Sequence, residues 1–233
     1  MRLFSAFCMI VLPSRLKVLL GRKLFGWDIH PTAYIGRSVI LVRHLSMGAG
    51  SSIGPLNVIR DLEELRLGDG ASIATRNWIT GFPRSPDLAS DPFPHSPKRR
   101  PALIMGKGAM ITVAHDIDCS DEVVIGDHSG LAGYRSAILT HSLNLVRDRF
   151  TTGPVVLGHH AAVMSGCTLM SGTRIPSRCV VSAHSVVTTP LTQELTFYGG
   201  DPAQAVRALP ETLGFFHRGE DPEADRSVLG VEA

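Results

Sequence analysis

Apolar and small residues recur every six positions in the C-terminal half of the chain. From Leu157 onward six hexads follow without interruption: LGHHAA, VMSGCT, LMSGTR, IPSRCV, VSAHSV and VTTPLT. Each hexad begins with a branched apolar residue, and the fifth place of the first five holds a small one. A period of six fits neither the 3.6 of an α-helix nor simple strand alternation, and it is typical of a hexapeptide parallel β-helix. We therefore expect short parallel strands joined by tight corners.

A second array with the same period lies nearer the N-terminus. Its hexads begin at Ile29, Ile35, Leu41, Met47, Ile53 and Ile59. Between the two arrays, single hexads begin at Leu67, Ile73, Met105, Ile111 and Ile125, with small slips of phase. We interpret the slips as bulges or loops. Together the arrays predict one elongated domain over residues 29–191, with room for about eight coils stacked about 4.8 Å apart.

Residues 81–101, GFPRSPDLASDPFPHSPKRRP, interrupt the hexads with six prolines in 21 residues. Proline removes a ladder donor and disfavours helix at the preceding residue, so this segment must leave the coil and return. Long excursions of this kind often form lids or binding walls. Lys98, Arg99 and Arg100 in it are candidates to contact a phosphate or an anionic saccharide, and a solvated loop edge is the alternative.

Both ends of the chain depart from the hexad pattern. Residues 1–28 predict a helical segment that caps the open end of the prism, or an amphipathic helix from Ser14 to Phe25 on an anionic membrane. The apolar run from Leu3 to Leu12 is too short to span a bilayer, and no convincing cleavage site follows it. Residues 192–233 predict a turn, a short helix at AQAVRAL and an acidic tail.

Composition narrows the class of protein. A formal net charge of +2 over 233 residues gives no support for a nucleic-acid partner. A hydrophobic content of 44% suffices for one continuous core. The four cysteines, at positions 8, 119, 167 and 179, form no CxxC pair. We expect them to be buried, reduced thiols, which suits a cytoplasmic protein.

These hexads resemble those of the left-handed β-helix acyltransferases, and in particular the sugar and polysaccharide O-acetyltransferases of the maltose and nodulation group. The resemblance implies an all-β fold: a left-handed parallel β-helix in which the leading residue of each hexad points into a triangular prism. It also implies a homotrimer with active sites between neighbouring rods, and acetyl-CoA or another acyl-CoA as co-substrate.

His141, in AILTHSLN, resembles the Thr-His segment that carries the catalytic histidine of this family. A neutral imidazole, with a reference pKa of about 6.5, is suited to take a hydroxyl proton and return it to a thiolate. Because a large polar side chain is costly inside an apolar prism, we expect His141 to face outward. Candidates to orient it are Ser142, Asn144 and Asp148, and spacing does not rank them.

The donor side of the site is implied by VSAHSVVTT, which resembles the family segment along the pantetheine channel. The implied coenzyme-binding residues are Ser165, Gly166, Ala183, Thr188, Thr189 and Arg207. Thr189 and Gln204 stand where the family has lysines, and the structural need of the coil for small residues is an equal explanation for Ser165 and Ala183. A backbone N–H, with Gly133 and Gly166 as candidates, would serve the oxyanion.

The acceptor side departs from the maltose enzymes, because the segment ITVAHD lacks their asparagine. Candidate acceptor-binding residues are Thr112, His115, Asp116 and Asn144, and for His115 a structural role is equally supported. A zinc site is not expected, because no two histidines stand five residues apart as in γ-type carbonic anhydrases, and the adjacent His159 and His160 point to opposite faces of a strand.

The sequence therefore predicts a CoA-dependent O-acetyltransferase that acts on a saccharide or glycolipid hydroxyl in surface polysaccharide or glycolipid synthesis. His141 is its predicted general base, and no metal is expected. The predicted location is the cytoplasm, with peripheral contact to the inner membrane face through the N-terminus. The alternatives are an N-acetyltransferase acting on an amino sugar, and a non-catalytic β-helix that binds or scaffolds.

Overall fold

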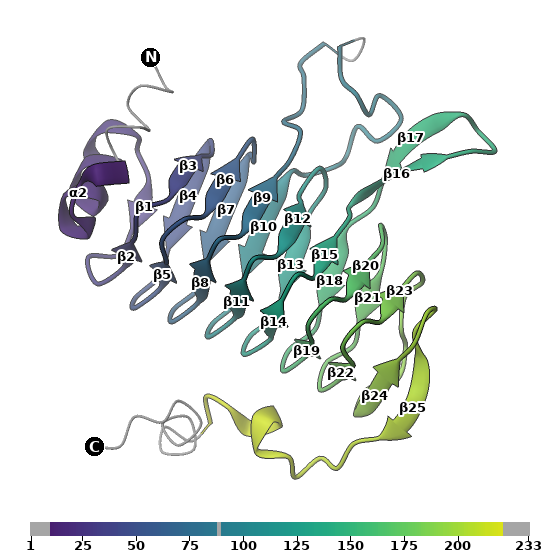
Figure 1. Ribbon diagram of the computed structural model, residues 1–233. Helices are drawn as coiled ribbons and strands as arrows, with labels where there is room; N and C mark the ends of the chain where they lie inside the picture. Colours follow the sequence, from purple (N-terminus) through teal and green to yellow (C-terminus); the bar gives the residue numbers. More distant parts are fainter. Residues whose placement is uncertain (1–9, 88–89, 221–233) are drawn as a thin grey trace.

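The chain folds as a left-handed parallel β-helix, as a computed structural model of residues 10–87 and 90–220 shows. Its strands stack like rungs along one axis, with successive coils beside one another (Figure 1). Each coil contributes one strand to each of three sheets, here called A, B and C, so that the sheets form the three faces of a prism.

The strand bounds follow the stacking order of each sheet. Sheet A contains β1 (Asp28–Ile29), β4 (His44–Met47), β7 (Glu64–Leu67), β10 (Ala102–Met105), β13 (Val123–Ile125), β18 (Val155–Leu157) and β21 (Arg174–Ile175). Sheet B contains β2 (Tyr34–Ile35), β5 (Ser52–Ile53), β8 (Ser72–Thr75), β11 (Met110–Val113), β14 (Gly130–Tyr134), β19 (Ala162–Val163), β22 (Val180–Val181), β24 (Thr196–Gly199) and β25 (Gln204–Ala208). Sheet C contains β3 (Val39–Leu41), β6 (Val58–Arg60), β9 (Trp78–Thr80), β12 (Asp116–Asp118), β15 (Ala137–Ile138), β20 (Thr168–Leu169) and β23 (Val186–Val187). A hairpin of β16 (His141–Asn144) and β17 (Arg149–Thr152) stands outside the three sheets.

The leading residues of the hexads fill the prism. All six leaders from Leu157 to Val187 are at most 1% exposed, and they belong to one continuous apolar core. In the earlier array one leader differs by one residue from the prediction, because Ile40 rather than Leu41 pairs with the buried Ile59. Leu41 instead pairs with the exposed Arg60.

The predicted slips of phase come from coils of unequal length. Ala162 pairs with Val180, 18 residues further on, whereas Leu45 pairs with Leu65 after 20 residues. In the longer coils the sheet A strand buries two side chains, as Leu65 and Leu67 do in β7. The two extra residues therefore widen one face of the prism without breaking the alternation that keeps apolar residues inside.

A ladder of polar side chains runs inside the corner between sheets B and C. Asn57 Oδ1 accepts hydrogen bonds from Asn77 N and Nδ2, and Asn77 Oδ1 accepts one from His115 N. His115 Nδ1 in turn accepts a hydrogen bond from Ser136 N, and its Nε2 lies 3.0 Å from Thr112 Oγ1. These hydrogen bonds satisfy backbone N–H groups at the corners of successive coils. They also satisfy the polar side chains themselves, which is why side chains at most 1% exposed can be buried there.

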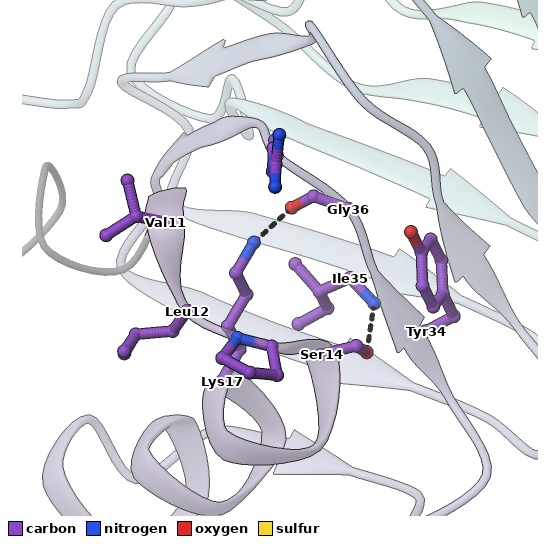
Figure 2. Close-up of a pocket in the computed structure, with 9 residues that line it drawn as sticks. Val11, Leu12, Ser14, Lys17, Tyr34, Ile35 and Gly36 are labelled. Carbon is purple, nitrogen blue, oxygen red and sulfur yellow. Dashed lines mark hydrogen bonds between the residues drawn. The ribbon is translucent and has the colours of Figure 1, made fainter.

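Helix α2 (Ser14–Leu24) covers the N-terminal end of the prism. It places Lys17, Val18 and Gly21 against the first coil, and Lys17 Nζ donates to the carbonyl oxygen of Gly36 (Figure 2). Ser14 Oγ accepts a hydrogen bond from Ile35 N. The helix thus satisfies groups at the exposed edge of sheet B, as a cap is expected to do. No helix within the described residues has the length and apolar character that a membrane crossing requires.

The C-terminal region differs from the predicted helix. AQAVRAL forms strand β25, which pairs antiparallel with β24, and a short 3-10 helix, η1 (Gly214–His217), follows it. Strand β24 continues sheet B in parallel with β22, so the chain can add a further strand at the sheet edge instead of forming a helix. The acidic tail beyond residue 220 lies outside the described residues.

Candidate active site

Three consecutive coils contribute residues to one site at the edge between sheets C and A. The Pro-rich loop, residues 81–101, leaves the prism after β9, and the β16–β17 hairpin leaves it after β15 (Figure 1). Between them lies the corner that follows β12, which carries Asp118. His141, the first residue of β16, stands at the base of the hairpin and faces outward with its side chain 32% exposed.

His141 is paired with a carboxylate from the preceding coil. Its Nδ1 lies 2.8 Å from Asp118 Oδ2, and the same oxygen accepts hydrogen bonds from Thr140 N and Thr140 Oγ1. Asp118 Oδ1 accepts hydrogen bonds from the backbone N and the hydroxyl of Ser120. Because an ionised carboxylate only accepts, Nδ1 carries the proton. Nε2 is therefore the basic nitrogen, and no described group hydrogen-bonds to it.

The pair is electrostatically coupled. The hydrogen bond to Asp118 raises the pKa of His141 above 6.5, against the opposing effect of burial. Burial acts to raise the pKa of Asp118, but hydrogen bonds from His141, Ser120 and Thr140 outweigh it and lower that pKa to about 2. Asp118 is therefore a fixed negative charge at neutral pH, and it stabilises the imidazolium that forms when Nε2 takes up a proton.

Three phenylalanine rings surround the imidazole of His141, and we call them the phenyl collar. Phe82 and Phe93 come from the Pro-rich loop and Phe150 from β17; their ring centroids lie 6.1, 5.5 and 6.5 Å from that of His141. Phe93 also contacts both other rings, with centroid distances of 5.8 and 6.3 Å. Phe93 is buried, whereas Phe82 and Phe150 are about half exposed. The basic nitrogen thus lies in apolar surroundings that solvent can reach.

A buried arginine fixes the Pro-rich loop against the coil. The Arg99 side chain is 0% exposed and forms an ion pair of 2.9 Å with Asp91, itself buried. Arg99 also donates to the carbonyl oxygens of Phe82, Pro83 and Ser120. Its guanidinium lies 4.9 Å from the centroid of the Phe93 ring. One side chain therefore holds two members of the phenyl collar and contacts the corner that carries Asp118.

These contacts bear on the predicted phosphate-binding triplet at positions 98–100. Arg99 is occupied within the loop, and Arg100 forms ion pairs with Glu64 and Glu122. Lys98 is exposed, and no described residue forms an ion pair with it. The triplet therefore anchors the loop through two of its three cations, and of the three only Lys98 forms no ion pair with a described residue.

The hairpin is fastened to the same corner. Asp121 accepts hydrogen bonds from Arg100 N, where the loop ends, and from Thr152 Oγ1, where β17 ends. Asp121 N donates to Thr140 Oγ1, and Thr152 N donates to Ser96 Oγ over 3.3 Å. Loop, corner and hairpin therefore hold His141 and the phenyl collar as one assembly.

The predicted acceptor-binding residues are not gathered around His141. His115 and Thr112 belong to the internal corner ladder, and burial lowers the pKa of His115 to about 4. Asp116 is exposed on sheet C, on the same strand and the same face as Asp118. Asn144 lies at the far end of β16, where its Oδ1 accepts from Arg147 N. Asp116 is the member of this set that shares a surface with the His141–Asp118 pair.

The predicted coenzyme-binding residues lie on two edges of the prism. Ser165 with Gly166 and Ala183 occupy the corner between sheets B and C in adjacent coils, since His184 N donates to Ser165 O. Thr188 and Thr189 are exposed on the edge that carries His141, two coils further along. Arg207 belongs to β25, and its guanidinium lies 5.1 Å from the centroid of the Phe197 ring. Gly166 N already donates to Tyr134 O, so it is occupied as an oxyanion donor.

Within one chain, the Ser165 corner and His141 lie at opposite edges of sheet C. Strand β20 begins after the Ser165 corner and runs toward the edge that carries His141.

No cluster of three or more histidine, cysteine or acidic residues in the described part of the chain is arranged to hold a metal ion. The described cysteines, Cys119, Cys167 and Cys179, are free and buried, and burial raises the pKa of each thiol.

Asp118 and the phenyl collar are not among the residues predicted from the sequence. Asp118 lies 23 residues before His141, and the three nearby candidates for a partner, Ser142, Asn144 and Asp148, form no hydrogen bond with the imidazole because the hairpin carries them away from it. A usable signal was present, since Asp118 falls about one coil before His141. The rings could not be placed without knowing how the loop folds back.

No protein-family model and no curated protein matches the chain. A mutant of AntD, an N-acyltransferase from Bacillus cereus, solved with dTDP-4-amino-4,6-dideoxyglucose and coenzyme A, is similar with a TM-score of 0.58 at 14% identity, over 82% of this chain and 91% of that one. A second AntD mutant, with dTDP and coenzyme A, gives a TM-score of 0.51 at 14% identity over 87% and 91%. A hexapeptide-repeat-containing acetyltransferase from Vibrio cholerae gives 0.48 at 21% identity over 62% and 73%. The two AntD likenesses agree with the fold class that the structure shows, a left-handed parallel β-helix.

Proposed function

We propose that this protein transfers an acetyl or other short acyl group from acyl-CoA to a hydroxyl group of a saccharide or glycolipid. The observation that carries the proposal is the His141–Asp118 pair, which leaves an unbonded, partly exposed basic nitrogen on the outer surface of the β-helix. A structural histidine would be expected to have both ring nitrogens engaged, as His115 has. The similar AntD structures, which contain coenzyme A, support acyl-CoA as the donor.

The chemistry needs one base and no covalent enzyme intermediate. His141 Nε2 accepts the proton of the acceptor hydroxyl while its oxygen attacks the thioester carbonyl carbon, and a tetrahedral intermediate forms. The carbon–sulfur bond then breaks, and the proton on Nε2 passes to the departing thiolate. Asp118 stays ionised throughout, holds the imidazole orientation and stabilises its protonated form. The ester and free coenzyme A leave, and His141 is neutral again.

The donor site is proposed to lie between copies of the chain in a homotrimer. Ser165, Gly166 and Ala183 lie across sheet C from His141, so a donor held by this corner would have to reach the base of a neighbouring rod. The exposed face of sheet C between the two edges carries Trp78, 51% exposed, beside Asp116. We propose that this face contributes to the contact between copies.

N-acylation of an amino sugar is the second candidate. It is favoured by the similarity to AntD, an N-acyltransferase whose structure contains an amino-dideoxy sugar nucleotide. The same base and the same donor would serve an amine, with Nε2 removing a proton from nitrogen instead of oxygen. The two reactions differ in product chemistry, because an ester is cleaved by mild hydroxylamine and an amide is not.

The test is an acceptor screen with acetyl-CoA that follows coenzyme A release and product mass, using wild type and His141→Ala. Wild type should give acceptor-dependent release with a mass gain of one acetyl group, and His141→Ala should be about 10²- to 10⁴-fold slower. His159→Ala serves as a control, since that exposed imidazole lies at the edge between sheets A and B. An equal rate in wild type and His141→Ala would remove the assignment.

We also propose a cytoplasmic location with peripheral contact to an anionic membrane. The outward surface of α2 exposes Leu16, Leu19 and Leu24 together with Arg15, Arg22 and Lys23, and the helix contains no acidic residue. Such a surface suits binding to acidic headgroups. Sedimentation with vesicles of anionic lipid, compared with neutral lipid, tests it. Replacing Leu16 and Leu19 by Gln should abolish sedimentation, and equal sedimentation with both lipids would contradict the proposal.

A further inference from the structure

The surroundings of the base indicate what kind of acceptor it can receive. The rings of Phe82 and Phe150 are 48% and 49% exposed beside an imidazole that is 32% exposed. Leu143, also exposed, pairs with Phe150 and lies on the same face of the hairpin. Arg99, the cation of the loop that contacts the Phe93 ring, is fully buried and paired with Asp91. A molecule that approaches Nε2 therefore meets carbon on several sides and no free charge on these residues.

The polar groups around the imidazole are already engaged with one another. Both oxygens of Asp118 accept hydrogen bonds from within the site. Thr140 Oγ1 donates to Asp118 and accepts from Asp121 N, and Thr152 Oγ1 donates to Asp121. The hydrogen-bond donors among these groups are therefore occupied, and they have none left for a second hydroxyl of the acceptor. A second hydroxyl placed against the phenyl collar would be desolvated without compensation.

We propose that the phenyl collar makes the enzyme selective for deoxy sugars, meaning saccharides that carry hydrogen or methyl in place of a hydroxyl near the reacting position. This inference rests on the proposed acyl transfer and specifies its acceptor. Phe82 and Phe150 are specificity-determining residues, and Phe93 supports both rings from below the surface. A CH or methyl face packs against phenyl rings, whereas a hydroxyl there loses water.

The expected discrimination is about 10- to 100-fold in kcat/KM, since an apolar site rejects an added hydroxyl by about that factor. It should appear mainly in KM, because the rings contact the acceptor without touching the proton that His141 removes. This separates the phenyl collar from the His141–Asp118 pair, whose loss acts on kcat.

The experiment measures kcat/KM with acetyl-CoA for matched methyl glycosides: D-fucoside with D-galactoside, 6-deoxyglucoside with glucoside, 2-deoxyglucoside with glucoside, and 4-amino-4,6-dideoxyglucoside with 4-amino-4-deoxyglucoside. Wild type should prefer the deoxy member of at least one pair by 10-fold or more. Phe82→Ala and Phe150→Ala should reduce that ratio to about 3 or less, and Phe82→Leu should keep it. Phe25→Ala, which alters a ring stacked on Trp27 directly after α2 at the N-terminal end of the rod, is the matched control.

Three outcomes would overturn the inference. Wild type could show no pair with a ratio above 3, or the ratio could be unchanged in both alanine variants. The variants could instead change the preference among acetyl-, propionyl- and butyryl-CoA and leave the acceptor ratio intact, which would assign the rings to the acyl group. Failure of the proposed function looks different, because wild type and His141→Ala would then release coenzyme A equally with every acceptor.

Discussion

At the scale of single residues, the position of one proton decides whether His141 can act. Asp118 holds that proton on Nδ1 and leaves the lone pair of Nε2 exposed. The carboxylate also raises the affinity of the imidazole for a second proton, so the pair is a stronger base than an isolated histidine. The raised pKa of His141 therefore predicts how the reaction rate depends on pH.

In wild type, kcat/KM should rise with pH through a midpoint above 6.5, because only neutral His141 is a base and its pKa is raised. Asp118→Asn removes the charge that raises this pKa and lets the amide donate to Nδ1, which selects the wrong tautomer. We expect a loss of about 10²-fold or more and a midpoint shifted toward 6.5. Rate profiles between pH 5.5 and 9 check both, and an unshifted midpoint would contradict the role of Asp118.

His115 shows how the same side chain serves stability when it is buried. Its folded pKa of about 4 lies below the unfolded value of about 6.5, so between these values the unfolded chain binds a proton that the folded chain does not. Stability is therefore complete above pH 6.5 and falls as pH drops toward 4. The cost attributable to His115 should be about 2 kcal/mol between pH 7 and pH 5.

His115→Asn tests this, because Asn57 and Asn77 occupy the preceding steps of the same ladder. The variant should fold. Between pH 7 and pH 5 its free energy of unfolding should fall by about 2 kcal/mol less than that of wild type. Urea unfolding of wild type and variant, at equal protein concentration, measures it. Identical pH dependence in the two proteins would show that His115 is not the titrating group.

At the scale of elements, the Pro-rich loop is held by ion pairs and not by a helix or a sheet of its own. Arg99 is the centre of that attachment. Removing one partner of a buried pair leaves an unpaired charge and costs about 3–5 kcal/mol. The cost falls on the loop, because the prism core contributes none of these contacts apart from Ser120 O.

Arg99→Ala should therefore release the loop while the rod stays folded. We expect chymotrypsin to cleave the loop at least 10-fold faster than in wild type, with unchanged far-ultraviolet circular dichroism and a lower kcat/KM. Arg100→Ala, which breaks two exposed ion pairs, should change cleavage little. Equal cleavage of Arg99→Ala and wild type would show that other contacts fix the loop.

The elements differ in how far the sequence predicts them. A period of six specifies the strands because every turn repeats the same requirement for one apolar and one small side chain, and the leaders from Leu157 to Val187 all point inward. AQAVRAL has no such repetition, and a free sheet edge decided its conformation. The partner of His141 depends on the length of the coil, which varies: Asp116 pairs with Ala137 after 21 residues, whereas Ala162 pairs with Val180 after 18.

At the scale of the whole molecule, one chain carries His141 and the proposed donor corner on different edges of sheet C. Mixed assemblies test whether neighbouring copies complete the site. His141→Ala and Ala183→Trp should each be inactive alone. When the two are unfolded together and refolded as a random mixture, about a quarter of the sites would combine an intact His141 with an intact donor corner from another copy. Activity near that fraction of wild type is expected, and none would place both parts within one chain.

Segments outside the coils cover part of the strand edges at both ends of the rod, and this limits how the rod can assemble. Stacked parallel strands expose N–H and C=O groups at each end, where another chain could pair and extend the ladder. Helix α2 occupies one end, while at the other Leu191 N bonds to Arg174 O and Ala203 N to Val186 O. The segments at the two ends therefore set the number of coils in the rod. At the edges that these segments occupy, another chain finds no free N–H or C=O group to pair with, so the rod is better suited to assembly side by side than end to end.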